Sequence, residues 1–255
     1  MEDEARQMFE EFVQEYNRVM TPELQATQRA MRWIYPTHSF VEESYGSVEI
    51  KRGSLNSGIY SLQKFPFYTH LRVDGQIPLT QLYIDGEYWM ADDPYHVIGQ
   101  HNLINGYRGH VVLVGLGLGI SLYDSIFNQN ITKITVIELN KDLVTLLLKY
   151  FEKYFNTVMR GLWKPIPKKI EIIQGDFFDN LDLCYGADRV FVDIFTNENY
   201  HDYKPKVNDA VEKIKRESLA IGAVTRINKW VFDFNEKPIK RMRTLAPEFL
   251  NVKKY

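Results

Sequence analysis

Residues 110–140 constrain the fold of this chain more than any other stretch. The stretch opens with an apolar run at 111–114, which has the length and β-branched composition of a buried strand. A glycine-rich turn follows, then an amphipathic segment, and then a second apolar run that ends on the acid Glu138. The order strand, glycine turn, helix, strand and acid predicts a βαβ unit whose turn can hold a nucleotide.

The glycines of this turn are Gly115, Gly117 and Gly119, separated by single leucines. Glycine lets a ligand approach the backbone closely and tolerates a positive φ, and the N–H groups that open the next helix favour anionic groups. The dinucleotide fingerprint G-x-G-x-x-G would place its third glycine at Ile120. The spacing therefore favours the G-x-G-x-G loop of S-adenosylmethionine enzymes, with a nicotinamide-dependent oxidoreductase as the weaker alternative.

Composition narrows the class of protein. The chain has 255 residues and a net charge of −2, so no overall basic field calls for a nucleic-acid partner. The single cysteine, Cys184, excludes a disulfide within the chain and fits a reducing compartment. No apolar run has the length of a membrane span, and no paired histidine or cysteine motif indicates a metal. We expect a cytoplasmic protein with no membrane association and no metal.

Changes of hydrophobic period divide the chain into three expected parts. Residues 1–38 have helical periodicity, which predicts an N-terminal helical segment. Residues 39–104 alternate in polarity and contain Asp74-Gly75 and Asp85-Gly86, both typical of hairpin turns, which predicts a small antiparallel sheet. Residues 105–255 are expected to form a nucleotide-binding domain of mostly parallel strands with helices on both faces.

Further strands are expected after the βαβ unit at 170–173, 189–192 and 219–227, with a last short strand at 249–252. The first ends in Gly175-Asp176, the second ends on Asp193, and the third has Gly222 inside it. In a parallel sheet, ligands bind outside the carboxyl ends of the strands. We therefore expect Glu138, Asp176 and Asp193 to converge there with the glycine turn, although each acid could instead be a solvated strand end or a cap.

In this arrangement the chain resembles the class I S-adenosylmethionine-dependent methyltransferases. Within that superfamily it is most similar to the spermidine synthases, the polyamine aminopropyltransferases. The resemblance covers residues 39–230 and rests on the order of four elements: an N-terminal β-sheet, the hairpin Leu82-Tyr83-Ile84-Asp85-Gly86, the acidic stretch Asp92-Asp93-Pro94-Tyr95-His96, and the glycine turn. It implies a Rossmann-like methyltransferase fold and S-adenosylmethionine or its decarboxylated form as cofactor.

The resemblance also implies roles for individual residues. The three glycines of the turn would face the amino-acid or aminopropyl part of the cofactor, and Glu138 would bind the ribose hydroxyls. Asp176 would accept the adenine amino group, with Gly175 and Phe177 beside it. Asp193 would hold the substrate ammonium and take its proton. Independently of the resemblance, the cluster formed by Tyr88, Trp89, Tyr95 and His96 could line the substrate side as a lid over the acceptor, although the sequence slightly favours a place in the core between two layers.

Several positions depart from the family pattern. Leu118 stands where the family's glycine loop usually has an acid, and Trp89 stands where the family usually has a glutamine. The second acid that usually follows the position of Asp193 is absent. A diamine pocket needs several carboxylates for its ammonium groups. We expect a transferase that moves a methyl or aminopropyl group to a small nucleophilic acceptor, and the resemblance points to an amine. The resemblance also implies a dimer or tetramer at most. The alternative is a catalytically degenerate relative with a binding or structural role.

Overall fold

The structure is a computed structural model. It describes residue 37 and residues 40–56, 58–62, 69–73, 76–158, 169–196 and 199–229. The helical segment predicted at 1–38, apart from Thr37, and the short strand predicted at 249–252 lie outside these residues. Among the described residues, no helix is long and apolar enough to cross a membrane.

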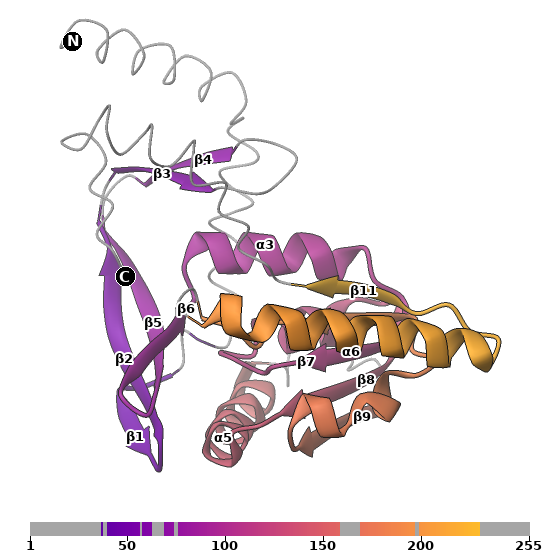
Figure 1. The fold of residues 1–255 in the computed structure, drawn as a ribbon. Coiled ribbons are helices and arrows are strands. Elements are labelled where there is room, and N and C mark those ends of the chain that lie inside the picture. Colours follow the sequence, from indigo (N-terminus) through magenta and orange to yellow (C-terminus); the bar gives the residue numbers. More distant parts are fainter. Residues whose placement is uncertain are drawn as a thin grey trace, which may run out of the picture.

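The first part of the chain forms antiparallel strands (Figure 1). Four strands pair in the order β1-β2-β5-β6, and their bounds are Glu43–Tyr45, Val48–Leu55, Ile77–Ile84 and Glu87–Ala91. The predicted hairpin at Asp85-Gly86 is confirmed and joins β5 to β6. Asp85 and Gly86 have φ angles of 53° and 79°, as a type I′ hairpin turn requires.

The hairpin turn predicted at Asp74-Gly75 lies outside the described residues. The strands on either side of this dipeptide are β4 (Thr69–Val73) and β5. β4 pairs with β3 (Gly58–Leu62) in a separate two-stranded sheet, whereas β5 pairs with β2 and β6. Eight residue pairs join β5 to β2, and β6 pairs with the other edge of β5, so both edges of β5 have partners and neither of these is β4.

The second part is a five-stranded parallel sheet in the order β11-β10-β7-β8-β9. Counted along the chain from β7, these strands follow the order 5-4-1-2-3, which is the doubly wound order of Rossmann-like folds. The expected fold class is thereby confirmed. The strands are β7 (Gly109–Val114), β8 (Ile131–Glu138), β9 (Lys169–Gln174), β10 (Arg189–Val192) and β11 (Arg226–Lys229).

Helices cover both faces of this sheet (Figure 1). Along β7, Val111 and Leu113 point into one core cluster, and Val112 and Val114 point into another. The first cluster includes residues from α4 (Ile120–Phe127), α5 (Lys141–Val158) and the preceding helix α3 (Pro94–Asn105). The second includes residues from α6 (Tyr200–Ala220) and from the short 3-10 helices η2 (Phe177–Asp179) and η3 (Leu181–Cys184).

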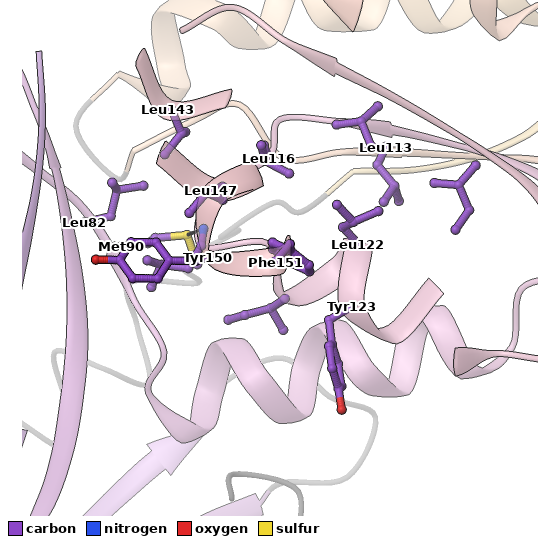
Figure 2. Close-up of a cluster of buried hydrophobic side chains, with 14 of the residues drawn as sticks. Leu82, Met90, Leu113, Leu116, Leu122, Tyr123, Leu143, Leu147, Tyr150 and Phe151 are labelled. Atoms are coloured by element: carbon purple, nitrogen blue, oxygen red, sulfur yellow. Dashed lines mark hydrogen bonds between the residues drawn. The ribbon is translucent and has the colours of Figure 1, made fainter. Parts of the chain in front are cut away.

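The first cluster also joins the four-stranded antiparallel sheet to the five-stranded parallel sheet (Figure 2). The antiparallel sheet contributes Val48, Ile50, Leu82 and Met90, all of them buried. These side chains share a cluster with residues of the parallel sheet, such as Leu113. The two sheets therefore have one continuous apolar core between them.

The fifth strand of the parallel sheet is shorter than predicted. The expected range was 219–227, but α6 continues to Ala220 and β11 begins only at Arg226. Gly222 has a φ of +77° and follows the helix end, where Ala223 N–H donates to the Ser218 carbonyl at 2.9 Å. Gly222 is thus part of a helix C-terminal turn. The apolar residues around it, Leu219, Ile221 and Val224, are exposed.

Candidate functional site

The glycine turn links the end of β7 to α4 and lies against the ends of β8 and β10. Gly115 N–H donates to the Ile137 carbonyl at 2.9 Å. Gly115 has a φ of +90°, and a Cβ there would lie 2.0 Å from the backbone carbonyl oxygen of Asp193. Only glycine fits this position, because both the backbone angle and the neighbouring strand exclude a side chain. Gly119, with a φ of +76°, precedes α4 and abuts the Phe151 ring.

Glu138 ends β8 and lies beside the glycine turn. Its carboxylate accepts the Leu116 N–H at 2.7 Å and the Asn140 N–H at 2.7 Å. The side chain is buried, and burial raises the pKa of Glu138 while these backbone N–H groups oppose the rise. A carboxylate has about four lone-pair sites, so Glu138 retains acceptor capacity for a diol.

Asp176 follows β9 and caps η2, since its Oδ1 accepts the Phe178 N–H at 2.8 Å. Gly175 N–H donates to the Glu138 carbonyl at 2.9 Å, so this loop lies directly beside the end of β8. Phe177 is buried in the cluster beneath α6. The neighbouring Phe178 is only partly buried, so of the two rings Phe178 is the more accessible.

Asp193 follows β10 at the position where the strand order reverses, and its N–H donates to the Val114 carbonyl at 2.8 Å. Its Oδ2 accepts a hydrogen bond from Gln100 Nε2 at 3.0 Å, and Gln100 Oε1 accepts one from Ser121 Oγ at 2.7 Å. Burial raises the pKa of Asp193 to about 7, and the nearby His96 limits the rise. A carboxyl group with this pKa can hold or release a proton near neutral pH.

His96 lies in α3, which precedes the first strand of the parallel sheet in the chain. Its Nδ1 lies 2.8 Å from Asp93 Oδ2. Burial lowers the pKa of His96, but the carboxylates of Asp93 and Asp193 outweigh burial, so the net shift is upward. The predicted site residue His96 is thus electrostatically coupled to Asp193, as a partner that favours the ionised carboxylate.

Two other predicted substrate-side residues, Tyr88 and Trp89, belong to β6 of the antiparallel sheet. The Tyr88 ring contacts the Tyr83 ring edge-on, with centroids 5.5 Å apart, within the antiparallel sheet. Trp89 packs against the core cluster that joins the two sheets. Tyr95 belongs to α3, but its side chain lies outside what the structure describes. For these three residues, a role in acceptor binding stays a prediction.

Met90 covers part of the glycine turn, which the sequence pattern did not indicate. Leu118 N–H donates to Met90 Sδ at 3.3 Å, and a Cβ on Gly117 would lie 2.5 Å from the same sulfur atom. Figure 2 shows Met90 in the buried cluster with Leu82 from β5 and Leu147 from α5. A ligand that needs the Leu118 N–H must therefore displace the Met90 thioether.

Gln100 and Ser121 were also not predicted from the sequence as part of the site. One signal could have found the glutamine, because His96 and Gln100 are four residues apart and share one face of α3. Which partner that face meets depends on tertiary packing. Within the described ranges, no group of three or more histidine, cysteine or acidic side chains could hold a metal.

No protein-family model matches the chain, and no curated protein matches it either. Solved structures give low similarity. A protein from Pyrococcus horikoshii, considered an RNA methyltransferase, has 15% identity and a TM-score of 0.38, with 59% of this chain and 64% of that one covered. Spermidine synthase from Thermotoga maritima has 13% identity and a TM-score of 0.33, covering 45% of this chain and 42% of that one.

A third solved structure is the precorrin 8w decarboxylase from Methanobacterium thermoautotrophicum. It has 14% identity and a TM-score of 0.35, with 58% of this chain and 72% of that one covered. The chain covers less than two thirds of the length of the Pyrococcus horikoshii protein and less than half of that of the spermidine synthase. Since identity and overlap are this low, function has to be inferred from the chain's own residues.

Proposed function

We propose that this chain is a transferase that binds S-adenosylmethionine or decarboxylated S-adenosylmethionine at the carboxyl edge of its parallel sheet. It would transfer a methyl or aminopropyl group to a small nucleophilic acceptor, an amine. The observation that carries the proposal is the position of Asp193. This acid lies at the point where the strand order reverses, its backbone touches the glycine turn, and its pKa is near 7.

The adenosine part of such a cofactor fits the residues present. Glu138 is a buried carboxylate with acceptor capacity beyond its backbone N–H partners, which suits a ribose diol. The loop of Asp176 is hydrogen-bonded to the end of β8 through Gly175, which suits a base bound beside the ribose. Glu138 would hold the ribose hydroxyls and Asp176 the adenine amino group.

Asp193 supplies the acceptor side of the chemistry. When bound, the cofactor provides an electrophilic carbon beside a sulfonium sulfur. Asp193 would hold the ammonium group of the acceptor and take its proton, leaving an amine lone pair free to react. The upward pKa shift suits this task, because the carboxylate is then basic enough to receive a proton near pH 7.

Calorimetric titration with S-adenosylmethionine, its decarboxylated form and methylthioadenosine tests the binding half of this proposal. We expect at least one of the two complete cofactors to bind, and Glu138→Gln to weaken binding about tenfold, the usual scale for a lost hydrogen bond to a charged group. Asp193→Asn should keep cofactor affinity while abolishing turnover of amine acceptors. If none of the ligands binds to the unmodified chain, the proposal fails.

The position of Met90 favours a second candidate, a non-catalytic protein with a binding or structural role. Its sulfur accepts the Leu118 N–H, which the amino-acid part of a cofactor would otherwise approach. In this case the Met90 contact would be permanent, and the glycine turn would serve packing alone. Methylthioadenosine binding without binding of the two complete cofactors, together with no transfer to amines, would support this candidate over a transferase.

A further inference from the structure

The amide of Gln100 has its orientation fixed from both ends. Gln100 is buried within α3. An ionised Asp193 can only accept hydrogen bonds, so the amide must turn its NH₂ group toward that carboxylate. The amide oxygen then needs a donor, and the Ser121 hydroxyl provides it at 2.7 Å. Ser121 lies in the first turn of α4, immediately after the glycine turn.

We infer that Gln100 is a positioning residue for Asp193: its amide, clamped by Ser121, holds the Asp193 carboxylate in one orientation and favours its ionised form. The inference rests on the proposed function only in assigning Asp193 a chemical task. Among the described residues, Gln100 gives Asp193 its one side-chain hydrogen bond. This amide also connects the helix after the glycine turn to the acid across the site.

The charged groups around Asp193 set the direction of the expected effect. His96 lies in α3, the helix that also carries Gln100, and it interacts electrostatically with Asp193. Asp93 is bound to His96, and the buried Asp92 is also close to His96. Burial pushes the Asp193 pKa up, and His96 pulls it down. A donated hydrogen bond also stabilises the charged form. Removing the Gln100 amide should therefore raise the pKa of Asp193 further.

The decisive variant is Gln100→Met, which keeps side-chain length and helix propensity but removes the donor. Carbon NMR titration of the Asp193 carboxyl, with no ligand present, should show its pKa rising by about one unit, as expected for a lost hydrogen bond to a charged group. If the variant turns over substrate, its rate at pH 7 should fall about fivefold and recover by about pH 9, because the carboxylate is then ionised again. A packing defect would not recover with pH.

Ser121→Ala provides a second, milder variant. Freeing the amide oxygen should raise the Asp193 pKa in the same direction by a smaller amount. The matched control is Thr225→Val, which removes a buried 2.8 Å hydroxyl contact with Ser218 outside the Asp193 network and should leave Asp193 unchanged. If Gln100→Met does not fold, Ser121→Ala decides by the same titration.

The possible results separate this inference from the proposed function. A shift in the Asp193 titration supports positioning by Gln100, even if no substrate is ever turned over. An unchanged Asp193 pKa in a folded Gln100→Met protein, or in Ser121→Ala when the first variant is unfolded, overturns it. Failure of cofactor binding would overturn the transferase proposal alone, because the titration needs no ligand.

Discussion

At the scale of single residues, Gly115 shows how a position can be fixed by two separate constraints. Its φ of +90° is unfavourable for any other residue, and the carbonyl of Asp193 occupies the space of a Cβ. The glycine is therefore explained by the close approach of β7 and β10, with or without a ligand. A glycine-rich turn by itself says little about what binds beside it.

Gly115→Ala should destabilise the protein by about 3 kcal/mol, because it adds a steric clash with backbone to an unfavourable φ. Urea unfolding followed by circular dichroism would measure the loss. Gly86→Ala is the matched control, since Gly86 has a φ of +79° but nothing within 4 Å of a Cβ. Its cost should stay near 1 kcal/mol. Equal costs for the two variants would contradict the role given to the Asp193 carbonyl.

Asp193 itself should lower stability at neutral pH. Its folded-state pKa of about 7 lies above the ordinary 3.8, so the folded protein binds the proton more tightly than the unfolded chain. Stability therefore falls as pH rises between these values, and the full cost is present above pH 7. Asp193→Asn should raise the free energy of unfolding by about 1–2 kcal/mol at pH 8, after discounting for partial solvent access.

This difference between Asp193→Asn and the unmodified chain should shrink below pH 7 and vanish only at about pH 3, where the Asp193 carboxyl is neutral in the folded and unfolded states. Urea unfolding of the two proteins at several pH values would measure it. An equal effect at about pH 3 and pH 8 would instead indicate a packing change. The same measurement gives an independent check on the pKa that the proposed chemistry needs.

At the scale of secondary-structure elements, the βαβ unit was predictable because its signals are local. Apolar runs, a glycine turn and a terminal acid are enough to place β7, α4 and β8. The fifth strand was overextended because an exposed apolar helix end, including Leu219 and Ile221, imitates a buried strand. Burial is a tertiary property, and a single sequence carries no direct record of it.

The partners of Asp193 and of the glycine turn were not predictable for the same reason. Gln100 meets Asp193 because α3 packs beside α4, which no local pattern records. Met90 reaches Gly117 from β6, which pairs with β5 through a register shift at Leu82/Tyr83. A shift of register changes which side chains face the core, and it depends on the pairing of whole strands.

Because Met90 of β6 contacts the glycine turn, shortening its side chain should lower the stability of the protein but strengthen cofactor binding. Met90→Ala should cost about 3 kcal/mol of stability, as usual for truncating a buried methionine. It also releases the Leu118 N–H, so a cofactor that uses this turn should bind about tenfold more tightly. Thermal unfolding and calorimetry would measure the two effects separately.

Leu82→Ala is the control for this prediction, because Leu82 is buried and pairs with Met90 across the antiparallel sheet. It should lose similar stability without any gain in affinity. A gain in affinity for both variants would point to general loosening of the core. No gain for Met90→Ala would mean that the thioether does not compete with a ligand.

At the scale of the whole molecule, two tethers join the antiparallel sheet to the carboxyl edge of the parallel sheet. Ser47, in the turn between β1 and β2, donates from its N–H to Asp142 Oδ2 at 2.9 Å. Its hydroxyl accepts Asn140 Nδ2 at 2.9 Å, and the Asn140 N–H in turn binds Glu138. Met90 makes the second connection, at the glycine turn. The glycine turn thus contacts the antiparallel sheet directly through Met90, and Glu138 is linked to it through Asn140.

The continuous core between the sheets has a consequence for any attempt to shorten the protein. Cutting the chain just before the parallel sheet would strip Val48, Ile50, Leu82 and Met90 from their neighbours and leave an apolar surface bare. Such a fragment would keep every glycine and acid proposed to bind the cofactor, yet it should aggregate when it is expressed. Recombinant work on the nucleotide half alone would then report on aggregation rather than on binding.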